Sequence, residues 1–470
     1  MLLPTQLAHY EGEVCKVILD IFHSGAMPPK LNMTHVALIP KVKRPTSVTE
    51  FRPISLCNVL YKIISKVLAN RLKLILPQII APTQSAFISG CLISDNVLAA
   101  YETLHTMHTG MRGKKGFMAV KLDMSKTYDK VEWGFLEAVM KQMGFGERWI
   151  ALIMMCVRTV RYSILVNGNP CGIITPSRGI RQGGPISPYL FLLCAEALSA
   201  MITRANGDGR LTGVPTSKRG PEISHLFFAD DSLLFCRATL MQWNHLSAIL
   251  QLYEEASRQK MNANKTTIFF SRNTAVTDKE QIKEVAGIPT NQRYDKYLGL
   301  PSLVGRSRMK AFKSITDRVW KRLQDWKVKF LSQAGKEILL KAVIQAIPTY
   351  CIGVFLLPKA LCSDINSLMA KFFWGHKDKD KRIHWMNWSK LSLSKAQGGM
   401  GFRDLSCFNK ALLAKQVWRL WKIPDSLIAK IMKAKYFPDD SILKAPLGKK
   451  PSFAWRSIHS SRDLLKEGLV

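Results

Sequence analysis

Two adjacent carboxylates interrupt an apolar stretch, and they are the side chains of this sequence best suited to chemistry. The stretch reads His225-Leu-Phe-Phe-Ala-Asp-Asp-Ser-Leu-Leu-Phe235. Its apolar halves predict two buried strands, and Asp230 and Asp231 fall where a tight hairpin would turn. Neighbouring carboxylates beside buried strands repel each other and lose hydration, and a divalent cation relieves both costs. A solvated turn is the alternative interpretation, so a metal site needs a further ligand elsewhere.

Asp123 is the candidate for that third carboxylate. It follows residues 116–122, which have strand composition, and a helical pattern begins at about Asp129. A side chain that closes a strand can face a central cleft, although a turn acid or helix N-cap is the alternative for Asp123 alone. One strand-end acid and a hairpin pair fit a site for two Mg²⁺ or Mn²⁺ ions about 3.5–4 Å apart, the arrangement of polymerases and nucleases.

The composition indicates a polyanionic partner. The 470 residues carry a net charge of +34 at pH 7, and 47% of them are hydrophobic, which is enough for packed cores. Residues 301–470 hold 33 Lys and Arg against 12 Asp and Glu, a surplus of 21 positive charges, together with eight of the eleven Trp. Basic residues interleaved with aromatics suit phosphate contacts and base stacking, so nucleic acid is the expected partner. The alternative interpretation of the charge is a ribosomal or membrane-surface protein. The alternative for each Trp is a place in the hydrophobic core.

The cysteines and the apolar stretches exclude several classes of protein. The ten cysteines lie far apart without a Cys-x-x-Cys pair, so we expect no structural zinc and an intracellular protein of the nucleus or cytoplasm. The N-terminus lacks the basic and apolar regions of a signal peptide, so secretion is not expected. Residues 338–358 are apolar, but Pro348 divides them, so a buried helix with a second short element is expected and no membrane span.

Strand and helix patterns alternate along the chain. Helices are expected over 57–76, from Glu147, over 185–198, over 242–257 and from Arg308 onward. Strands are expected over 162–166 and 266–270, and the charged run 377–382 marks a break. Strand–helix–strand–strand order with helices to one side indicates an α+β layer.

With these segments in order, the chain resembles the reverse transcriptases of plant non-LTR (LINE-type) retrotransposons. The early matching segments are Leu38-Ile-Pro-Lys41, Phe51-Arg-Pro-Ile-Ser-Leu-Cys-Asn58, Tyr61-Lys-Ile-Ile-Ser-Lys66, Leu68-Ala-Asn-Arg-Leu72, Gln84-Ser-Ala-Phe87 and Asp95-Asn-Val-Leu98. The segment around Asp123 follows, then Arg178-Gly-Ile-Arg-Gln-Gly-Gly-Pro-Ile-Ser-Pro-Tyr-Leu-Phe191 and the Asp230 hairpin. The late ones are Tyr297-Leu-Gly-Leu-Pro301, Trp326-Lys327, Leu331-Ser-Gln-Ala-Gly-Lys336, Gln345-Ala-Ile-Pro348, Gly398-Gly-Met-Gly-Phe-Arg-Asp-Leu405 and Ala414-Lys-Gln416.

The resemblance implies a right-hand polymerase of fingers, palm and thumb, with a helical basic C-terminal extension. The implied parts are an N-terminal extension and fingers (1–115), a palm with the remaining fingers (116–301), a thumb (302–358) and the extension (359–470). The implied reaction is RNA-directed DNA synthesis, with an RNA template, a DNA primer and deoxynucleoside triphosphates as partners. Two Mg²⁺ or Mn²⁺ ions would be bridged by Asp123 and Asp230 with the help of Asp231.

The same resemblance implies roles for residues around the metals. Lys41 and Arg52 would contact the incoming triphosphate, and Lys265 would protonate the leaving pyrophosphate. Tyr128 would exclude a 2′-hydroxyl by its bulk. Gln182 and Gly183 would lie against the incoming base and the template. The alternatives are surface charge for the three cations and a core aromatic for Tyr128.

The chain departs from the family pattern at four positions. Gly184 stands in place of the usual Asp, Thr127 in place of a small Ala, Cys91 in place of an Arg, and Arg258 in place of a Gly. The change at position 258 matters if the backbone needs a positive φ at that position. The family's endonuclease, Cys/His-rich and RNase H parts are not recognised here, so a truncated copy is expected. An inactive nucleic-acid-binding relic is therefore a second interpretation, and an intron-maturase-like RNA-binding protein is a third.

Overall fold

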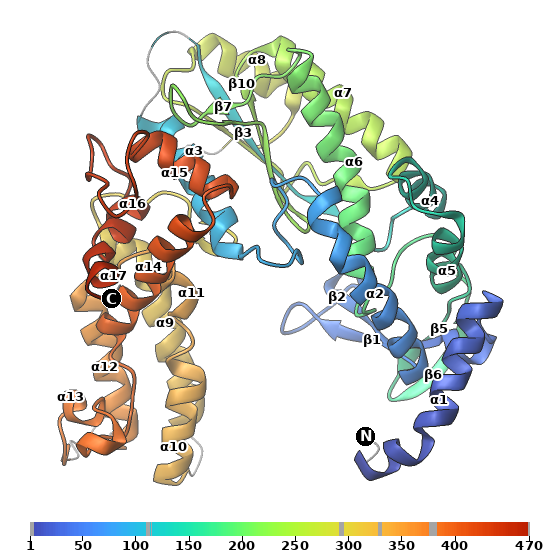
Figure 1. Cartoon of the computed structure of the whole chain (residues 1–470), viewed down its shortest axis with the longest axis horizontal. Helices are drawn as coiled ribbons and strands as arrows, with labels where there is room; N and C mark the ends of the chain where they lie inside the picture. The colour runs from blue at the N-terminus through green and yellow to red at the C-terminus, as the bar shows by residue number, and fades with distance from the viewer. Residues whose placement is uncertain are drawn as a thin grey trace.

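The chain forms an arch with two arms, and a β-sheet lies near its crown (Figure 1). The computed structural model describes residues 4–109, 113, 115–290, 296–327, 331–375 and 383–468. One arm carries the N-terminal helices α1 (Pro4–Ser24) and α2 (Val59–Ile79), and the other carries the C-terminal helices from α9 (Arg308–Lys327) onward. The predicted charged run 377–382 lies outside the described residues.

The palm sheet near the crown is antiparallel and has the strand order β12-β3-β10-β9. Its strands are β3 (Phe117–Leu122), β9 (His225–Phe228), β10 (Asp231–Arg237) and β12 (Thr267–Phe270). Side chains alternate between the two faces of a strand. Met118 and Val120 pack with α6 (Ser187–Gly207) and α7 (Leu240–Ser257), whereas Phe117 and Ala119 pack with α3 (Ile93–Thr109). Helices therefore cover both faces of this sheet, whereas the sequence pattern predicted helices on one side.

The fingers sheet lies in the N-terminal arm and has the order β2-β1-β5-β6. Its strands are β1 (Met33–Pro40), β2 (Phe51–Cys57), β5 (Arg161–Val166) and β6 (Asn169–Ile174), and β1 runs parallel to β5. Helices α2, α4 (Trp133–Gln142), α5 (Glu147–Arg158) and the first half of α6 share one apolar cluster in this arm. This sheet is thus built from two stretches of sequence on either side of β3.

Several predicted helix boundaries differ from the observed ones. Helix α4 begins at Trp133 instead of Asp129, because Lys126 has a left-handed φ of 49° and its carbonyl oxygen accepts the amides of Asp129 and Lys130 in a turn. Helix α6 begins at Ser187 and continues to Gly207. Among the described residues, α6 is the one helix long and apolar enough to cross a membrane, and 61% of its apolar window is buried inside the protein.

The C-terminal arm is helical, and its elements pack together with α3 around one apolar cluster. Phe312, Ile315, Val319 and Leu323 of α9 are all buried there, as their spacing predicted. Pro348 separates the π-helical turn Leu340–Ile344 from α11 (Thr349–Ile352). The other helices are α10 (Gln333–Leu339), α12 (Lys359–Phe373), α13 (Trp388–Leu391), α14 (Leu405–Lys422), α15 (Leu427–Tyr436), α16 (Phe453–His459) and α17 (Arg462–Gly468). The predicted thumb and extension therefore share one core.

A buried carboxylate joins this arm to the palm. Glu102 of α3 is fully buried, and its Oε2 accepts hydrogen bonds from Lys435 Nζ and Tyr436 OH, both at 2.7 Å. Its Oε1 accepts a hydrogen bond from Ser452 Oγ. A buried charge of this kind is tolerated only when it is paired and hydrogen-bonded, so these contacts fix α3 against α15 and α16.

Short elements complete the fold. They are 3₁₀ turns at Pro29–Asn32, Val48–Glu50 and Lys395–Gln397, the helix α8 (Val276–Ala286), and the small pairs β4 (Met124–Ser125) with β11 (Lys260–Met261), β7 (Val214–Pro215) with β8 (Glu222–Ile223), and β13 (Lys296–Tyr297) with β14 (Leu300–Pro301).

Candidate active site

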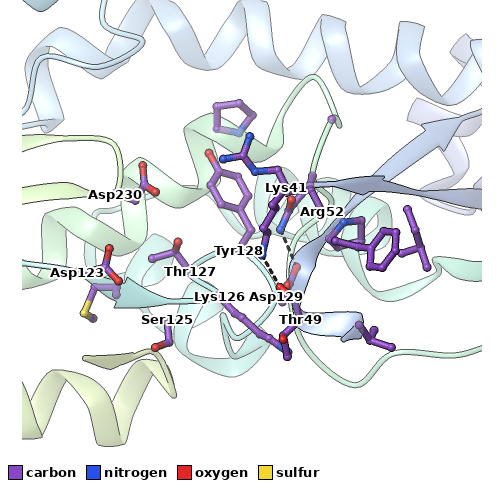
Figure 2. Close-up of a pocket in the computed structure, with 18 of the residues that line it drawn as sticks. Lys41, Thr49, Arg52, Asp123, Ser125, Lys126, Thr127, Tyr128, Asp129 and Asp230 are labelled. Atoms are coloured by element: carbon purple, nitrogen blue, oxygen red, sulfur yellow. Dashed lines mark hydrogen bonds between the residues drawn. The ribbon is translucent and has the colours of Figure 1, made fainter. Parts of the chain in front are cut away.

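A cleft of about 1080 Å³ lies between the fingers sheet and the palm. It brings together residues that lie as far apart in the chain as Leu38 and Lys265. The predicted site residues that line it are Lys41, Arg52, Asp123, Tyr128, Gln182, Gly183, Asp230 and Lys265. Figure 2 shows Asp123 and Asp230 at one end of the cleft and Lys41 and Arg52 toward the other, with Tyr128 between them. Asp231 is the predicted site residue that does not line it.

The palm hairpin places Asp230 at its tip. Asp231 pairs with Phe228 across the hairpin, so Ala229 and Asp230 form a two-residue turn. Ala229 has a φ of 52°, which is a left-handed conformation that a non-glycine residue adopts at a cost of about 1–2 kcal/mol. Phe227, which precedes the turn, is buried and anchors it through two hydrogen bonds. Its amide donates to Thr83 O at 2.8 Å, and its carbonyl oxygen accepts a hydrogen bond from Asn96 Nδ2 at 2.9 Å.

Asp123 lies beyond the last residue of β3 and is fixed through its backbone. Its amide donates to Thr266 Oγ1 at 3.2 Å, and its carbonyl oxygen accepts the amide of Asn262 at 2.8 Å. The side chain is half-buried and lines the cleft. In the described part of the chain, the carboxylates of Asp123 and Asp230 have no hydrogen-bond or ion-pair partner, so their oxygens are free to bind a ligand in the cleft.

Asp231 faces the other way. It lies on the same face of β10 as Leu233 and Phe235, which pack into the cluster of α3 and the C-terminal arm. Its negative charge also helps to raise the pKa of Tyr297 and of Tyr350, after burial of those phenols as the main cause. Burial raises the pKa of Asp231, and the nearby charges of Asp230 and Asp123 raise it further, against the opposing effect of Lys121.

The carboxylates that face the cleft suit a divalent cation. Within the described ranges, no three His, Cys, Asp or Glu side chains are arranged to hold a metal ion together. Mg²⁺, however, is commonly bound through one or two carboxylates and completes its shell with water and substrate phosphates. The donor set of Asp123 and Asp230 fits that mode, and the role predicted for Asp231 stays a prediction.

The cationic side chains of the cleft come from the fingers, from the turn after β4, which carries Lys126, and from the loop after β11. Arg52 of β2 pairs with Ile39 of β1 and is exposed, and Lys41 Nζ donates to Thr49 O at 2.9 Å. Lys265 is exposed in a turn in which its amide donates to Asn262 O. Since Asn262 also bonds Asp123, this turn places a cation beside the carboxylates. Positive side chains around a cleft that also contains carboxylates suit a polyphosphate.

Tyr128 belongs both to the wall of the cleft and to the core of the fingers. Its ring stacks on Phe191 with centroids 5.1 Å apart and an interplanar angle of 14°. Burial raises the pKa of Tyr128 to about 12, and the charge of Asp230 contributes to the rise. The ring is therefore held rigidly in its place beside Asp230 by packing.

The loop before α6 holds Gln182 and Gly183 against β2. Ser55 N donates to Gln182 O at 2.9 Å, and Gly183 has a φ of 100° with an added Cβ only 3.3 Å from Ser55 O. Glycine is needed for that conformation. The preceding Arg181 is buried, with its guanidinium 3.6 Å from the centroid of the Tyr61 ring and its Nη2 2.5 Å from Cys156 O.

Sequence reasoning missed two residues of the site. Gln84 contacts the turn of the palm hairpin, and Asp129 accepts a hydrogen bond from Gln182 Nε2 at 3.1 Å. Gln84 lies in a segment that carried the family resemblance, but its contact with the hairpin needs the fold. The polar Asp129 directly after the cleft-lining Tyr128 was the available signal for the other.

Position 258 has a positive φ, which is the condition under which the replacement of the usual glycine by arginine matters. Arg258 ends α7 with a φ of 58°, in the left-handed conformation. Gly184, by contrast, has no positive φ, and an added Cβ would lie 2.8 Å from Ser187 Oγ. The structure therefore explains the usual glycine at 258, but not the usual aspartate at 184.

Comparison with known proteins now identifies the family. Residues 39–332 match the family model described as reverse transcriptase (RNA-dependent DNA polymerase). An uncharacterized mitochondrial protein of Arabidopsis thaliana is 43% identical over 126 residues, covering 27% of this chain and 82% of that protein. An uncharacterized 149 kDa protein of the transposon TX1 of Xenopus laevis is 24% identical over 390 residues, covering 82% of this chain and 28% of that protein. This chain thus spans under a third of the transposon protein.

A solved structure of telomerase from Candida tropicalis with a fragment of telomeric RNA aligns with 90% of this chain and 68% of its own, with a TM-score of 0.42 and 10% identity. The family match covers more than half of the chain, including every predicted site residue from Lys41 to Lys265. The chain has the mixed α+β architecture of a right-hand polymerase. It belongs to the reverse transcriptase family and is related to the reverse transcriptases of non-LTR retrotransposons.

Proposed function

We propose that this chain is an RNA-directed DNA polymerase of a non-LTR retrotransposon. The observation that supports it best is the arrangement of the cleft in a chain of this family. Two carboxylates without protein partners in the described structure, Asp123 and Asp230, share the cleft with Lys41, Arg52 and Lys265. Such an arrangement suits transfer of a nucleotide from a triphosphate to a primer 3′-hydroxyl.

Asp123 and Asp230 would hold the divalent ions. When bound, these ions neutralise phosphate charge and make the 3′-hydroxyl a better nucleophile. Lys41 and Arg52 bind and orient the triphosphate from the fingers, and Lys265 gives its proton to the leaving pyrophosphate. Tyr128 fills the space beside the sugar. Its stacking on Phe191 prevents the ring from moving aside to admit a 2′-hydroxyl. Gln182 and Gly183 lie against the base.

The template and primer are proposed to be RNA and DNA, held in part by the basic C-terminal arm. Its charge surplus of 21 gives it many potential phosphate contacts. Trp320, Trp385, Trp418 and Trp421 are exposed there and offer faces for base stacking. The other described tryptophans of this arm are buried or half-buried and serve its core.

An inactive nucleic-acid-binding relic is the second candidate. The strained Arg258 and the side-chain direction of Asp231 favour it. The discriminating experiment is primer extension by the full chain on a poly(rA) or mixed-sequence RNA template with Mg²⁺. Extension by the parent, lost in Asp230→Asn and kept in the exposed Asp425→Asn, supports the polymerase. A folded parent that binds RNA without extending the primer supports the relic.

A further inference from the structure

Asp129 and Gln182 together form a partition between two hollows. Both line the nucleotide cleft, and both also line a smaller hollow of about 280 Å³ against the fingers sheet. The smaller hollow has mostly apolar walls, including Val36, Leu38 and Ile164. The hydrogen bond between Gln182 and Asp129 thus has open space on both sides. Without this hydrogen bond, the Gln182 side chain would have room to rotate.

The direction of this hydrogen bond determines which end of the amide is available. Gln182 Nε2 lies 3.1 Å from Asp129 Oδ1. A carboxylate can only accept, so the NH₂ end of the amide must face Asp129. The other end, Oε1, has no hydrogen-bond partner in the part of the chain that the structure describes. The carboxylate therefore leaves a fixed acceptor on Gln182 for a ligand.

Each partner is anchored by its own segment. The amide of Asp129 donates to Lys126 O at 3.0 Å, and Gly179, with a φ of 88°, approaches so closely that an added Cβ would be 2.7 Å from Asp129 O. The backbone of Gln182 is bound to Ser55 of β2. The side-chain bond is therefore an orienting contact between two backbones that are already held in place.

We propose that Asp129 is a positioning residue, which orients the amide of Gln182 toward the incoming nucleotide. The inference rests on the proposed function, because it takes the cleft to be the nucleotide site. Without its acceptor, the Gln182 side chain samples several rotamers, and part of the binding free energy is spent on ordering it. Losing one hydrogen bond of this kind should weaken nucleotide binding by about three- to tenfold.

Electrostatics makes the opposite prediction, which separates the two explanations. Asp129 is a negative charge beside a site for an anionic triphosphate, so its removal would strengthen binding if its charge were what mattered. Asp129→Asn removes the charge and keeps an oxygen acceptor, whereas Asp129→Ala removes both. A positioning role predicts that the Ala variant binds weakly and that the Asn variant recovers most of the affinity.

The experiment measures deoxynucleotide binding without chemistry. The full chain is bound to an RNA template with a 3′-dideoxy-terminated DNA primer, and titration with the complementary nucleotide is followed by a fluorescent base beside the templating position. The variants are Asp129→Ala, Asp129→Asn, Gln182→Ala and the double alanine variant, with Glu132→Ala as the control. Glu132 lies three residues after Asp129, at the start of α4, and its carboxylate pairs with Arg178, at 3.6 Å, instead of Gln182.

The expected result is a loss of about three- to tenfold in affinity for Asp129→Ala and Gln182→Ala alike, with no further loss in the double variant. The inference would be overturned if the loss in the double variant equalled the product of the two single losses. Tighter nucleotide binding by both Asp129 variants would overturn it as well. If the alanine variant does not fold, the isosteric Asp129→Leu takes its place. A parental complex that binds template and primer but no nucleotide defeats the proposed function itself, whereas normal binding by the Ala variant defeats only the role of Asp129.

Discussion

Gln84 Oε1 accepts a hydrogen bond from the amide of Ala229 at 3.2 Å, which joins the segment between α2 and α3 to the turn that carries Asp230. The same oxygen accepts the amide of Ala86 at 3.0 Å, and Gln84 is buried. Ala229 needs such support, because its left-handed backbone is strained. The position of a proposed metal ligand thus depends on a side chain about 145 residues earlier in the sequence.

Replacing Gln84 with Met should therefore impair both stability and activity. Met keeps the volume but removes the acceptor, and two amides are left without their partner, at a cost of about 1–3 kcal/mol in the free energy of unfolding. Urea unfolding and primer extension measure the two effects. Gln78→Met, at an exposed position of α2, is the matched control. Parental extension by a Gln84→Met protein with parental stability would show that the hairpin does not depend on this contact.

Asp230→Asn should abolish primer extension while the fold is retained. The change removes a ligand charge and almost no volume, and it eases repulsion with Asp231, so the melting temperature should stay the same or rise. Differential scanning fluorimetry without metal, beside the extension assay, tests both halves. Near-parental extension in Mg²⁺ would exclude Asp230 as a metal ligand.

Asp231 should make stability fall as pH rises. Its pKa is raised in the folded protein, so between the unfolded value of about 3.9 and the raised folded value the folded state binds more protons than the unfolded state. Stability is lost across that window, and Asp231→Asn should remove the loss. Urea midpoints of the parent and the variant, measured from pH 3.5 upward, should diverge in favour of the variant. A difference that does not change with pH would contradict this assignment.

Arg258→Gly should stabilise the protein by about 1 kcal/mol, because glycine adopts the left-handed conformation at the end of α7 without strain. Arg258→Ala is the control, since it removes the side chain and keeps the strain. Urea unfolding compares the three proteins. Equal gains from glycine and alanine would mean that the arginine side chain, and not the backbone, is unfavourable.

The basic C-terminal arm should account for much of the salt dependence of RNA binding. Lys313→Gln with Lys321→Gln, both exposed on α9, should flatten the slope of log K against log salt by about 0.7 for each single-strand phosphate that the protein no longer neutralises. Lys279→Gln with Lys283→Gln on α8 is the matched pair. Fluorescence anisotropy at several salt concentrations gives the slopes. Equal slopes for the two pairs would place the main phosphate contacts outside this face of α9.

The sequence predicted those features that local patterns determine. The apolar periodicity of α9, the composition of β3 and the two acids between apolar runs were sufficient, since each reflects burial of one face or of a whole strand. The direction of Asp231 follows from strand alternation, but only once the turn is known to end at Asp230. The contacts of Gln84 with Ala229 and of Asp129 with Gln182 join distant segments, and no local pattern encodes such pairs. The start of α4 was missed because a left-handed Lys126 delays it.

The Glu102 network also determines when, during synthesis of this protein, the core around α3 can complete its folding. Glu102 meets Ser452 across a separation of 350 residues, so this core stays incomplete until the segment that carries Ser452 has left the ribosome. Until then, α3 exposes an apolar face and a carboxylate without its partners, which is the kind of nascent surface that chaperones bind and proteases attack. A premature stop anywhere before Ser452 would therefore leave the apolar face of α3 exposed and Glu102 without one of its hydrogen-bond donors. The shortened protein should be degraded faster than the parent.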